Sequence, residues 1–165
     1  MILRKARLDD FEIFKKLYED EEGLYQFLYI CSKKEDCISC TPEPDCSYFF
    51  DESISELFSN YTLERFQKDL ESSSLLYMIE DSSEIIGYVS MFYCSAGKYK
   101  IAEWAMLNPD DEDKKAKVVD CLKKLKLPRL RKFSICTISD EVTQFLLANG
   151  FYSSGTCSFY SLDVV

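Results

Sequence analysis

The sequence predicts an α+β fold in which an antiparallel meander of strands leads into a βαβ crossover, with helices on both faces of one mixed sheet. Two observations predict it. Apolar runs of strand length follow one another between residues 75 and 107, separated by short polar turns. The last run, Tyr99 to Leu107, is followed by Pro109, an amphipathic helix and another strand, which is the order of a parallel crossover.

The crossover helix is expected from Glu112 to Lys126. The acidic residues 110–113 suit the positive end of a helix dipole, and Pro128 ends the segment. Its apolar residues recur at helical spacing and predict one buried stripe, made of Val118, Cys121, Leu122 and Leu125. Lys132 to Ile138 has the composition of the next strand. We therefore expect it to be a parallel neighbour of Tyr99 to Leu107.

The first half of the chain predicts a strand, two helices and a hairpin. Ile2 to Ala6 has the pattern of a short strand, and Asp9 is the expected N-cap of a helix that apolar residues 24–30 are able to continue. Thr62 is the expected cap of a second helix. Strands are expected from Leu75 to Glu80 and from Ile85 to Tyr93.

The end of the chain predicts one more helix and one more strand. Ser139 is the expected cap of a helix over residues 140–149, and Gly150 suits the left-handed position after its last turn. A final strand is expected from about Thr156 to Val164. All of these elements fit a single domain over residues 1–165.

The stretch from Cys31 to Asp51 is expected to be a loop inserted in that domain, because it combines prolines, mixed charge and four cysteines. Cys37 and Cys40 have the short spacing of zinc ligands, but the outer spacings, to Cys31 and Cys46, fit no known zinc module. The alternatives are a zinc-binding interaction module, a loop of reduced thiols and a loop with one redox-sensitive cysteine pair. We expect free thiols and no metal.

Charge and composition restrict the function. A net charge of −9 disfavours nucleic acid and anionic membranes as partners and is compatible with cationic substrates such as amines. The chain has no histidine, which excludes Ser-His and Cys-His catalysis and histidine metal sites. The early charges and the lack of a long apolar run predict a cytoplasmic protein.

The element order and four segments resemble the GNAT superfamily of N-acetyltransferases. The segments are ILRKARLDDFEIFKKLYED, LLYMIEDSSEIIGYVSMF, AEWAMLNPD and FLLANGFYSSGT, and together they extend over nearly the whole chain outside the cysteine loop. The resemblance implies a GNAT-like mixed sheet. It also implies transfer of an acetyl group from acetyl-CoA, as co-substrate, to an amine of a small molecule or peptide.

The resemblance implies that Glu103 deprotonates the amine. An ionised carboxylate within an apolar strand is costly unless it is used or paired, and alternation places it on one face with Ile101 and Ala105. The alternative is a salt-bridged Glu103 on a solvated face. The residues that the resemblance implies as contacts of acetyl-CoA are Ala105, Met106, Leu107, Lys114, Lys115, Ala116, Lys117 and Ser139.

The chain departs from this family at its diagnostic motif. The Arg/Gln-x-x-Gly-x-Gly/Ala pattern falls on Glu112, Lys115 and Lys117, and none of them matches. Leu146 stands where the family often has a proton-donating tyrosine. These departures predict weak acetyl-CoA binding and leave a second alternative, a degenerate non-catalytic domain that serves as a binding or regulatory module. The basic run 123–132 is expected to be solvated or, if CoA binds, to meet its 3′-phosphate.

Overall fold

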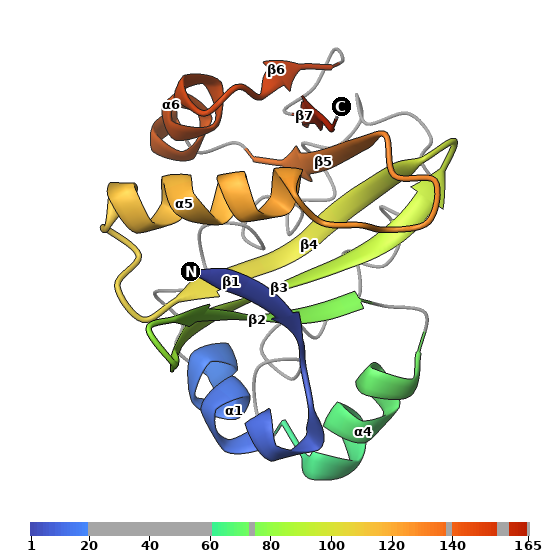
Figure 1. The fold of residues 1–165 in the computed structure, drawn as a ribbon, viewed down its shortest axis with the longest axis vertical. Helices are drawn as coiled ribbons and strands as arrows, with labels where there is room; N and C mark the ends of the chain where they lie inside the picture. Colours follow the sequence, from blue (N-terminus) through green and yellow to red (C-terminus); the bar gives the residue numbers. More distant parts are fainter. Residues whose placement is uncertain (20–60, 73–74, 138–139, 155–158, 165) are drawn as a thin grey trace, which may run out of the picture.

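The structure is a computed structural model that describes residues 1–19, 61–72, 75–137, 140–154 and 159–164. The strands form one seven-stranded sheet with the order β1-β2-β3-β4-β5-β7-β6 (Figure 1). The strands are β1 (Ile2–Lys5), β2 (Leu75–Asp81), β3 (Glu84–Ser95), β4 (Lys98–Met106), β5 (Lys132–Cys136), β6 (Tyr152–Ser153) and β7 (Phe159–Asp163). The helices are η1 (Leu8–Asp10), α1 (Phe11–Glu19), α4 (Leu63–Glu71), α5 (Glu112–Lys123) and α6 (Asp140–Ala148).

The predicted topology is confirmed. β1 to β4 are successive antiparallel neighbours, and β4 is parallel to β5 across the α5 crossover. β7 then runs antiparallel to β5 and carries the short β6 at the edge of the sheet. β6 was not predicted, because two residues are too few to show a period.

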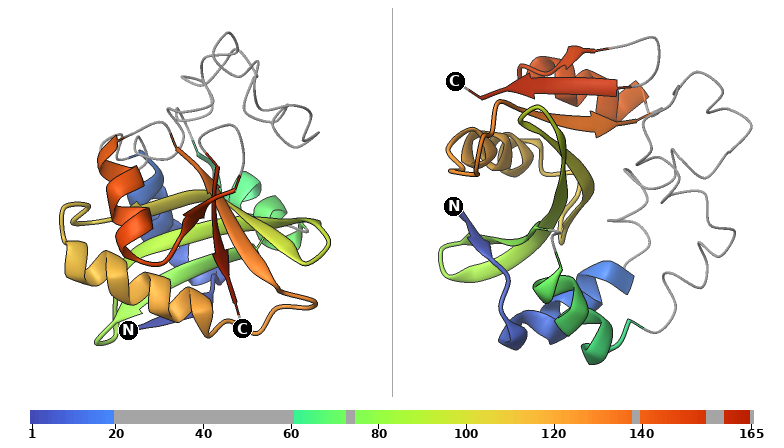
Figure 2. Two further views of the ribbon diagram at one scale, coloured as in Figure 1. Left: turned by 90° about the horizontal axis from the view of Figure 1, so that it is seen from above. Right: turned by 90° about the vertical axis from the view of Figure 1, so that its right-hand side faces the viewer.

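Helices cover both faces of the sheet, as predicted. α5 and α6 lie on one face, and α1 and α4 lie on the other (Figure 2). The α5/α6 face buries the larger apolar core, in which Val118, Val119 and Leu122 of α5 meet the sheet. The α1/α4 face buries a second, aromatic core, formed by Phe14, Leu17, Tyr18, Tyr61, Phe66, Met78, Tyr88 and Ala105. None of the described helices has the length and apolar character needed to cross a membrane.

The helix ends follow local chemistry. Asp111 caps α5 by accepting a hydrogen bond from the Lys114 amide, and Thr62 caps α4 through the Arg65 amide. The prediction of Asp9 as the cap of α1 was wrong. A single 3₁₀ turn, η1, precedes α1 instead, and the next carboxylate, Asp10, accepts from the Arg7 amide at 2.7 Å.

The parallel pair begins at a tight junction. Gly97 has a φ of +79°, and its carbonyl accepts hydrogen bonds from the Arg131 and Lys132 amides. A Cβ at this position would lie 2.4 Å from the Arg129 carbonyl oxygen, so only glycine fits. The start of β4 and the start of β5 are thereby held together, and any separation of the two strands occurs further along them.

An ion-pair network fixes α1 against the sheet edge. The Arg4 guanidinium donates to both carboxylate oxygens of Asp10 at 2.7 and 2.8 Å and to Glu80 at 2.8 Å. Burial opposes ionisation of Asp10, but the hydrogen bonds from Arg4 and Arg7 outweigh it and lower the pKa of Asp10.

Substituting Arg4→Ala is expected to lower the free energy of unfolding at pH 7 by about 1–3 kcal/mol, after allowance for partial exposure of the guanidinium. Because the pKa of Asp10 is lowered on folding, this stabilisation is present above the ordinary aspartate pKa and is lost as the pH falls through the folded pKa. Urea unfolding at several pH values should therefore show a difference in the free energy of unfolding between parent and variant. This difference should be constant near neutral pH and should become smaller in acid. Lys5→Ala, at an exposed neighbour, should change stability by less than about 0.5 kcal/mol. A difference independent of pH would contradict the assignment to Asp10.

Candidate active site

A β-bulge decides where Glu103 points. On β3, Ser90 and Met91 are consecutive, but their partners on β4 are Glu103 and Ile101, so Ala102 is an extra residue in β4. The bulge reverses the alternation of side chains. Ile101 therefore packs in the α5/α6 core, whereas Ala105 packs in the aromatic core under α1 and α4.

The expectation that Glu103 shares a face with both Ile101 and Ala105 was therefore wrong for Ile101. Glu103 and Ala105 lie on the same side of the bulge and two residues apart, so both face α1 and α4.

Beyond the bulge, β4 separates from β5. The two strands pair at only three positions, Lys98 with Lys132, Tyr99 with Phe133 and Lys100 with Ser134. β4 continues to Met106 without a further partner on β5, and Figure 1 shows the strands diverging toward the start of α5. Glu103 lies on the diverging part of β4.

The backbone direction along β4 distinguishes the predicted contacts. The Leu107 amide donates to the Ile86 carbonyl on the β3 side at 2.8 Å. The backbone N–H and C=O groups of successive residues point to opposite sides of a strand. Those of Ala105 therefore also point toward β3, while those of Trp104 and Met106 point toward the β5 side. Of the three strand residues that the resemblance implied, Met106 is the one whose backbone points toward the divergence.

The Glu103 carboxyl has a strongly raised pKa. The residue keeps some exposure, but its carboxyl is desolvated, and burial raises the pKa from 4.5 to about 7. The Tyr88 hydroxyl and the Arg65 guanidinium lower it, and the Asp69 carboxylate raises it. At neutral pH the group is thus populated both as carboxylate and as acid, which is the condition that a general base requires.

Tyrosines and one charged pair surround this carboxyl from α1 and α4. The Tyr61 hydroxyl donates to Asp69, and Arg65 donates to the Tyr18 hydroxyl at 3.4 Å. The guanidinium of Arg65 also lies 4.7 Å from the centre of the Tyr61 ring, a cation–π contact. Burial and the nearby Glu103 carboxylate raise the pKa of Tyr18 to about 12, so this hydroxyl stays protonated in the physiological range.

The start of α5 is already occupied by the chain's own groups. The Asp111 carboxylate accepts from the Lys114 amide at 3.0 Å, in the position that a bound anion takes at a helix N-terminus. Lys115 is 8% exposed, pairs with Glu112 at 2.6 Å and lies 5.0 Å above the Phe145 ring of α6. Ala116 and Lys117 follow on the same turn, Ala116 half-buried and Lys117 exposed.

The remaining predicted positions divide into two groups. Leu146, at the position where the family often has tyrosine, is fully buried in the α5/α6 core. Ser139 and the four cysteines of the 31–51 stretch lie outside the described residues. Among the residues that the structure does describe, Cys121 is a free thiol and no group of three or more metal-binding side chains occurs.

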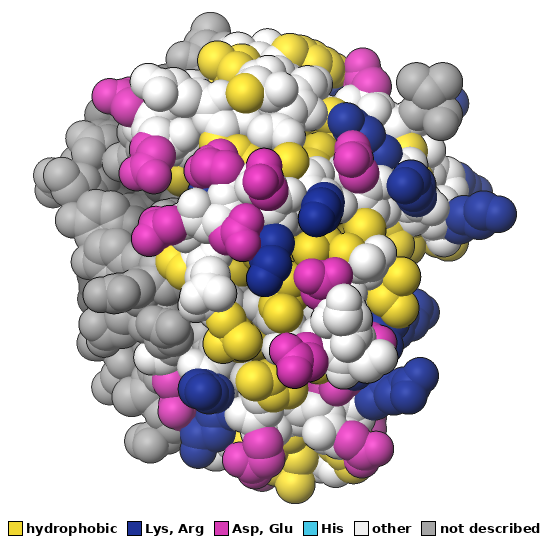
Figure 3. Space-filling model, turned by 60° about the vertical axis from the view of Figure 1, so that its left-hand side comes forward, with side chains coloured by type: hydrophobic (Ala, Val, Ile, Leu, Met, Phe, Trp, Pro, Cys, Tyr) yellow, Lys and Arg dark blue, Asp and Glu magenta, His cyan; other side chains and the backbone are white. Residues whose placement is uncertain are grey.

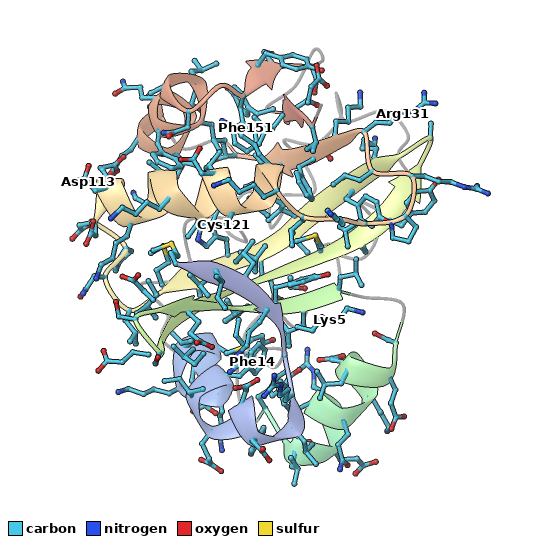
Figure 4. The ribbon with its side chains drawn as sticks, viewed as in Figure 1. Lys5, Phe14, Asp113, Cys121, Arg131 and Phe151 are labelled. Atoms are coloured by element: carbon cyan, nitrogen blue, oxygen red, sulfur yellow. The ribbon has the colours of Figure 1, made fainter. Side chains whose placement is uncertain are left out.

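The basic run lies far from the start of α5. Arg131 and Asp113 are on opposite sides of the molecule in Figure 4, and Arg131 adjoins Gly97 at the beginning of β4. That one residue of the basic run meets the 3′-phosphate of CoA stays a prediction. The face that carries the start of α5 shows acidic side chains with basic side chains between them (Figure 3).

Sequence reasoning missed the surroundings of Glu103. The sequence pattern did not single out Tyr18, Tyr61, Tyr88, Arg65 or Asp69 as neighbours of Glu103. A signal was present, because Arg65 and Asp69 are spaced i,i+4 on one face of a short helix that also carries the buried Phe66.

Comparisons with known proteins identify the fold. No family model and no curated protein matches the sequence. Among solved structures, the chain is similar to aminoglycoside 6′-acetyltransferase type Ii, with a TM-score of 0.57, 9% identity and coverage of 100% of this chain and 98% of that one. It is similar to the PaiA N-acetyltransferase of Thermoplasma acidophilum in complex with coenzyme A, with a TM-score of 0.57, 13% identity and coverage of 98% and 97%.

A third structure extends the comparison. It is the spermidine N-acetyltransferase of Vibrio cholerae in complex with CoA and spermine, with a TM-score of 0.57, 10% identity and coverage of 98% of this chain and 94% of that one. At these identities the likeness concerns the fold, and it extends over nearly the whole length of each protein. Together with the sheet order and the β4–β5 divergence, it shows that this chain has a divergent form of the GNAT N-acetyltransferase fold.

Proposed function

We propose that this protein is an acetyl-CoA-dependent N-acetyltransferase that acts on an amine of a small molecule or peptide. The observation that carries the proposal is the Glu103 carboxyl, whose pKa is raised to about 7 and which lies on the part of β4 that diverges from β5. A buried carboxyl poised near neutral pH beside a separation between strands is a candidate general base.

Glu103 would accept the proton of the acceptor's ammonium group. Acetyl-CoA supplies an activated thioester, so the chain itself needs to bind, orient and deprotonate the amine. One proton passes from the acceptor nitrogen to the Glu103 carboxylate and then to solvent. The second proton of the reacting nitrogen leaves with the departing thiol, which balances the transfer. A group that takes protons at pH 7 and returns them at the same pH suits this role.

The residues present fit acetyl-CoA at the strands better than at the helix. Along β4, Trp104 and Met106 direct backbone groups toward the β5 side, where they suit the amide-bearing pantetheine arm. At the start of α5, the Asp111 carboxylate takes the Lys114 amide, and Lys115 is paired with Glu112. We therefore propose that the pantetheine arm lies along β4 and that pyrophosphate binding at α5 is weak.

An amine acceptor is supported by charge and by analogy. The net charge of −9 favours cationic ligands over anionic ones. Two of the similar structures are named for amine-bearing substrates, spermidine and an aminoglycoside. We propose a cytoplasmic location, a compartment that keeps cysteines reduced, and the described Cys121 is a free thiol. We further propose that residues 1–165 form one domain.

A second candidate function is a binding or regulatory domain without catalysis. The start of α5 favours this second function, because the Asp111 carboxylate already accepts from the Lys114 amide, where an acetyl-CoA enzyme would bind the pyrophosphate. Acetyl-CoA binding separates the two proposals.

Changing Asp110, Asp111 and Asp113 to Asn is expected to tighten acetyl-CoA binding roughly tenfold, because it removes three negative charges within about one Debye length of the site. Asn at position 111 still caps the helix, so α5 keeps its start. A thermal-shift titration measures the effect, since a ligand that binds the folded state alone raises its stability with concentration.

The matched control is the triple change Asp9→Asn, Glu12→Gln and Glu71→Gln. It removes the same charge at exposed positions of η1, α1 and α4, on the face of the sheet opposite α5, and should leave the acetyl-CoA affinity unchanged. No shift at millimolar acetyl-CoA in either the parent or the α5 variant would favour the non-catalytic domain. A shift at micromolar acetyl-CoA in the parent would show that Asp111 and Lys115 do not weaken binding.

A further inference from the structure

Tyr88 and Glu103 are diagonal neighbours on one face of the sheet. Tyr88 of β3 pairs with Ala105, and Glu103 pairs with Ser90, so the two side chains are offset by two residues on adjacent strands. Diagonal pairs of this kind lie within reach of each other when a side chain is as long as tyrosine. The bulge at Ala102 is what turns Glu103 to this face, so it also creates the pair.

The Tyr88 hydroxyl is buried without a hydrogen-bond partner of standard length and angle among the described residues. Its side chain is 0% exposed, and the Phe14 ring lies over it with the centroids 4.6 Å apart. A buried hydroxyl without a partner costs stability, and native proteins rarely tolerate one without a use.

Other hydroxyls near Glu103 have defined partners. Tyr61 donates to Asp69, and Tyr18 accepts from Arg65. Each of these three tyrosines is electrostatically coupled to Glu103. Tyr88 also supports the ionised form of Glu103, because the nearby hydroxyl lowers the pKa of that carboxyl.

We propose that Tyr88 is a positioning residue that holds one oxygen of the Glu103 carboxylate and leaves the other oxygen free to receive the proton of the acceptor amine. A hydroxyl suits this task because it donates to a carboxylate and accepts from a carboxylic acid. Tyr88 itself stays protonated, since burial holds its pKa well above 10. The inference rests on the proposed function for its role in turnover, but the pairing of the two groups does not.

Several other groups face Glu103 and must be considered in any titration. Asp69 of α4 raises its pKa and Arg65 of α4 lowers it, while Tyr18 of α1 and Tyr61, just before α4, remain neutral. Tyr61→Phe is the matched control. It removes one buried tyrosine hydroxyl from the same aromatic core, but this hydroxyl is bonded to Asp69 rather than to Glu103.

The test is a carbon-13 NMR titration of the Glu103 carboxyl in the parent, Tyr88→Phe and Tyr61→Phe proteins, without any substrate. The parent midpoint is expected near pH 7. Tyr88→Phe should raise it by about one pH unit, which is the usual effect of losing one hydrogen bond to a charged group. Tyr61→Phe should move it by less than half as much. An unchanged midpoint in Tyr88→Phe, or equal shifts in both variants, would overturn the inference.

The kinetic arm tests the role in turnover separately. In Tyr88→Phe, the apparent pKa of the acidic limb in the pH dependence of kcat should rise by the same amount as the NMR midpoint. KM for the amine should change less than kcat. If the parent protein transfers no acetyl group but the NMR midpoint still moves, the proposed function fails and the pairing of Tyr88 with Glu103 stands. If the parent is active and the limb does not move with the midpoint, the positioning role is wrong.

Discussion

Replacing Glu103 with glutamine is expected to lower kcat/KM for amine acetylation by about 10²- to 10⁴-fold, the usual contribution of a general base. Glutamine has nearly the same shape as glutamate but takes no proton. The residual activity should lose the pH dependence near 7 that the parent owes to this carboxyl. Initial rates between pH 5.5 and 9 in the parent and in Glu103→Gln measure both effects.

The same substitution is expected to stabilise the protein at high pH. A carboxyl whose pKa is raised on folding, here from 4.5 to about 7, binds more protons in the folded state than in the unfolded state. Its presence therefore costs stability that increases as the pH rises from about 4.5 through 7 and is constant above. At pH 8 this cost in the free energy of unfolding is at most about 3 kcal/mol, and Glu103→Gln should remove it.

Glu84→Gln is the control for these two effects. Glu84 is an exposed glutamate at the start of β3, so its replacement should leave both the rate and the pH dependence of stability unchanged. Lower activity in Glu103→Gln without any gain in stability at pH 8 would mean that the carboxyl is not desolvated in the free protein. Full activity would exclude Glu103 as the base.

Substituting Phe14→Ala is expected to lower the free energy of unfolding by about 3–5 kcal/mol. The Phe14 ring is 2% exposed and lies 5.0 Å from the rings of Tyr61 and Phe66 and 4.6 Å from the ring of Tyr88. Removing it leaves a cavity between α1 and the sheet, directly over the face that carries Glu103. Urea unfolding at pH 7 measures the loss.

Phe11→Ala is the matched control, since it makes the same chemical change at a half-buried position whose described ring contact is with Phe66 at 5.7 Å. It should cost clearly less than Phe14→Ala. The Glu103 midpoint should also fall toward its ordinary range in Phe14→Ala, because water enters the cavity. Equal losses in both variants would show that the aromatic core is not organised around Phe14.

The sequence was sufficient for the parallel crossover because each of its parts has a local cause. The acidic residues at 110–113 and the apolar stripe of α5 predicted the helix, and Asp111 indeed caps it. The cap of α4 at Thr62 has an equally local cause. Such features depend on neighbours in the chain, so they can be inferred before the fold is known.

The surroundings of Glu103 depend on tertiary structure and were not predictable in the same way. The bulge at Ala102 carries neither glycine nor proline, so strict alternation placed Glu103 on the wrong face relative to Ile101. The prediction of Asp9 as the cap failed because the helical segment begins earlier, at η1 after Arg7, and the carboxylate that accepts from the Arg7 amide is Asp10, which Arg4 of β1 also holds. The tyrosines around Glu103 meet only once α1 and α4 pack on the sheet.

Backbone amide NMR during an acetyl-CoA titration locates binding without requiring turnover. If the pantetheine arm lies along β4, concentration-dependent shifts are expected at Trp104 and Met106 of β4 and at Ile135 of β5, with smaller shifts at Lys114 and Lys115 of α5. No shift at millimolar acetyl-CoA, or shifts confined to the basic run around Arg131, would show that acetyl-CoA does not bind between β4 and β5.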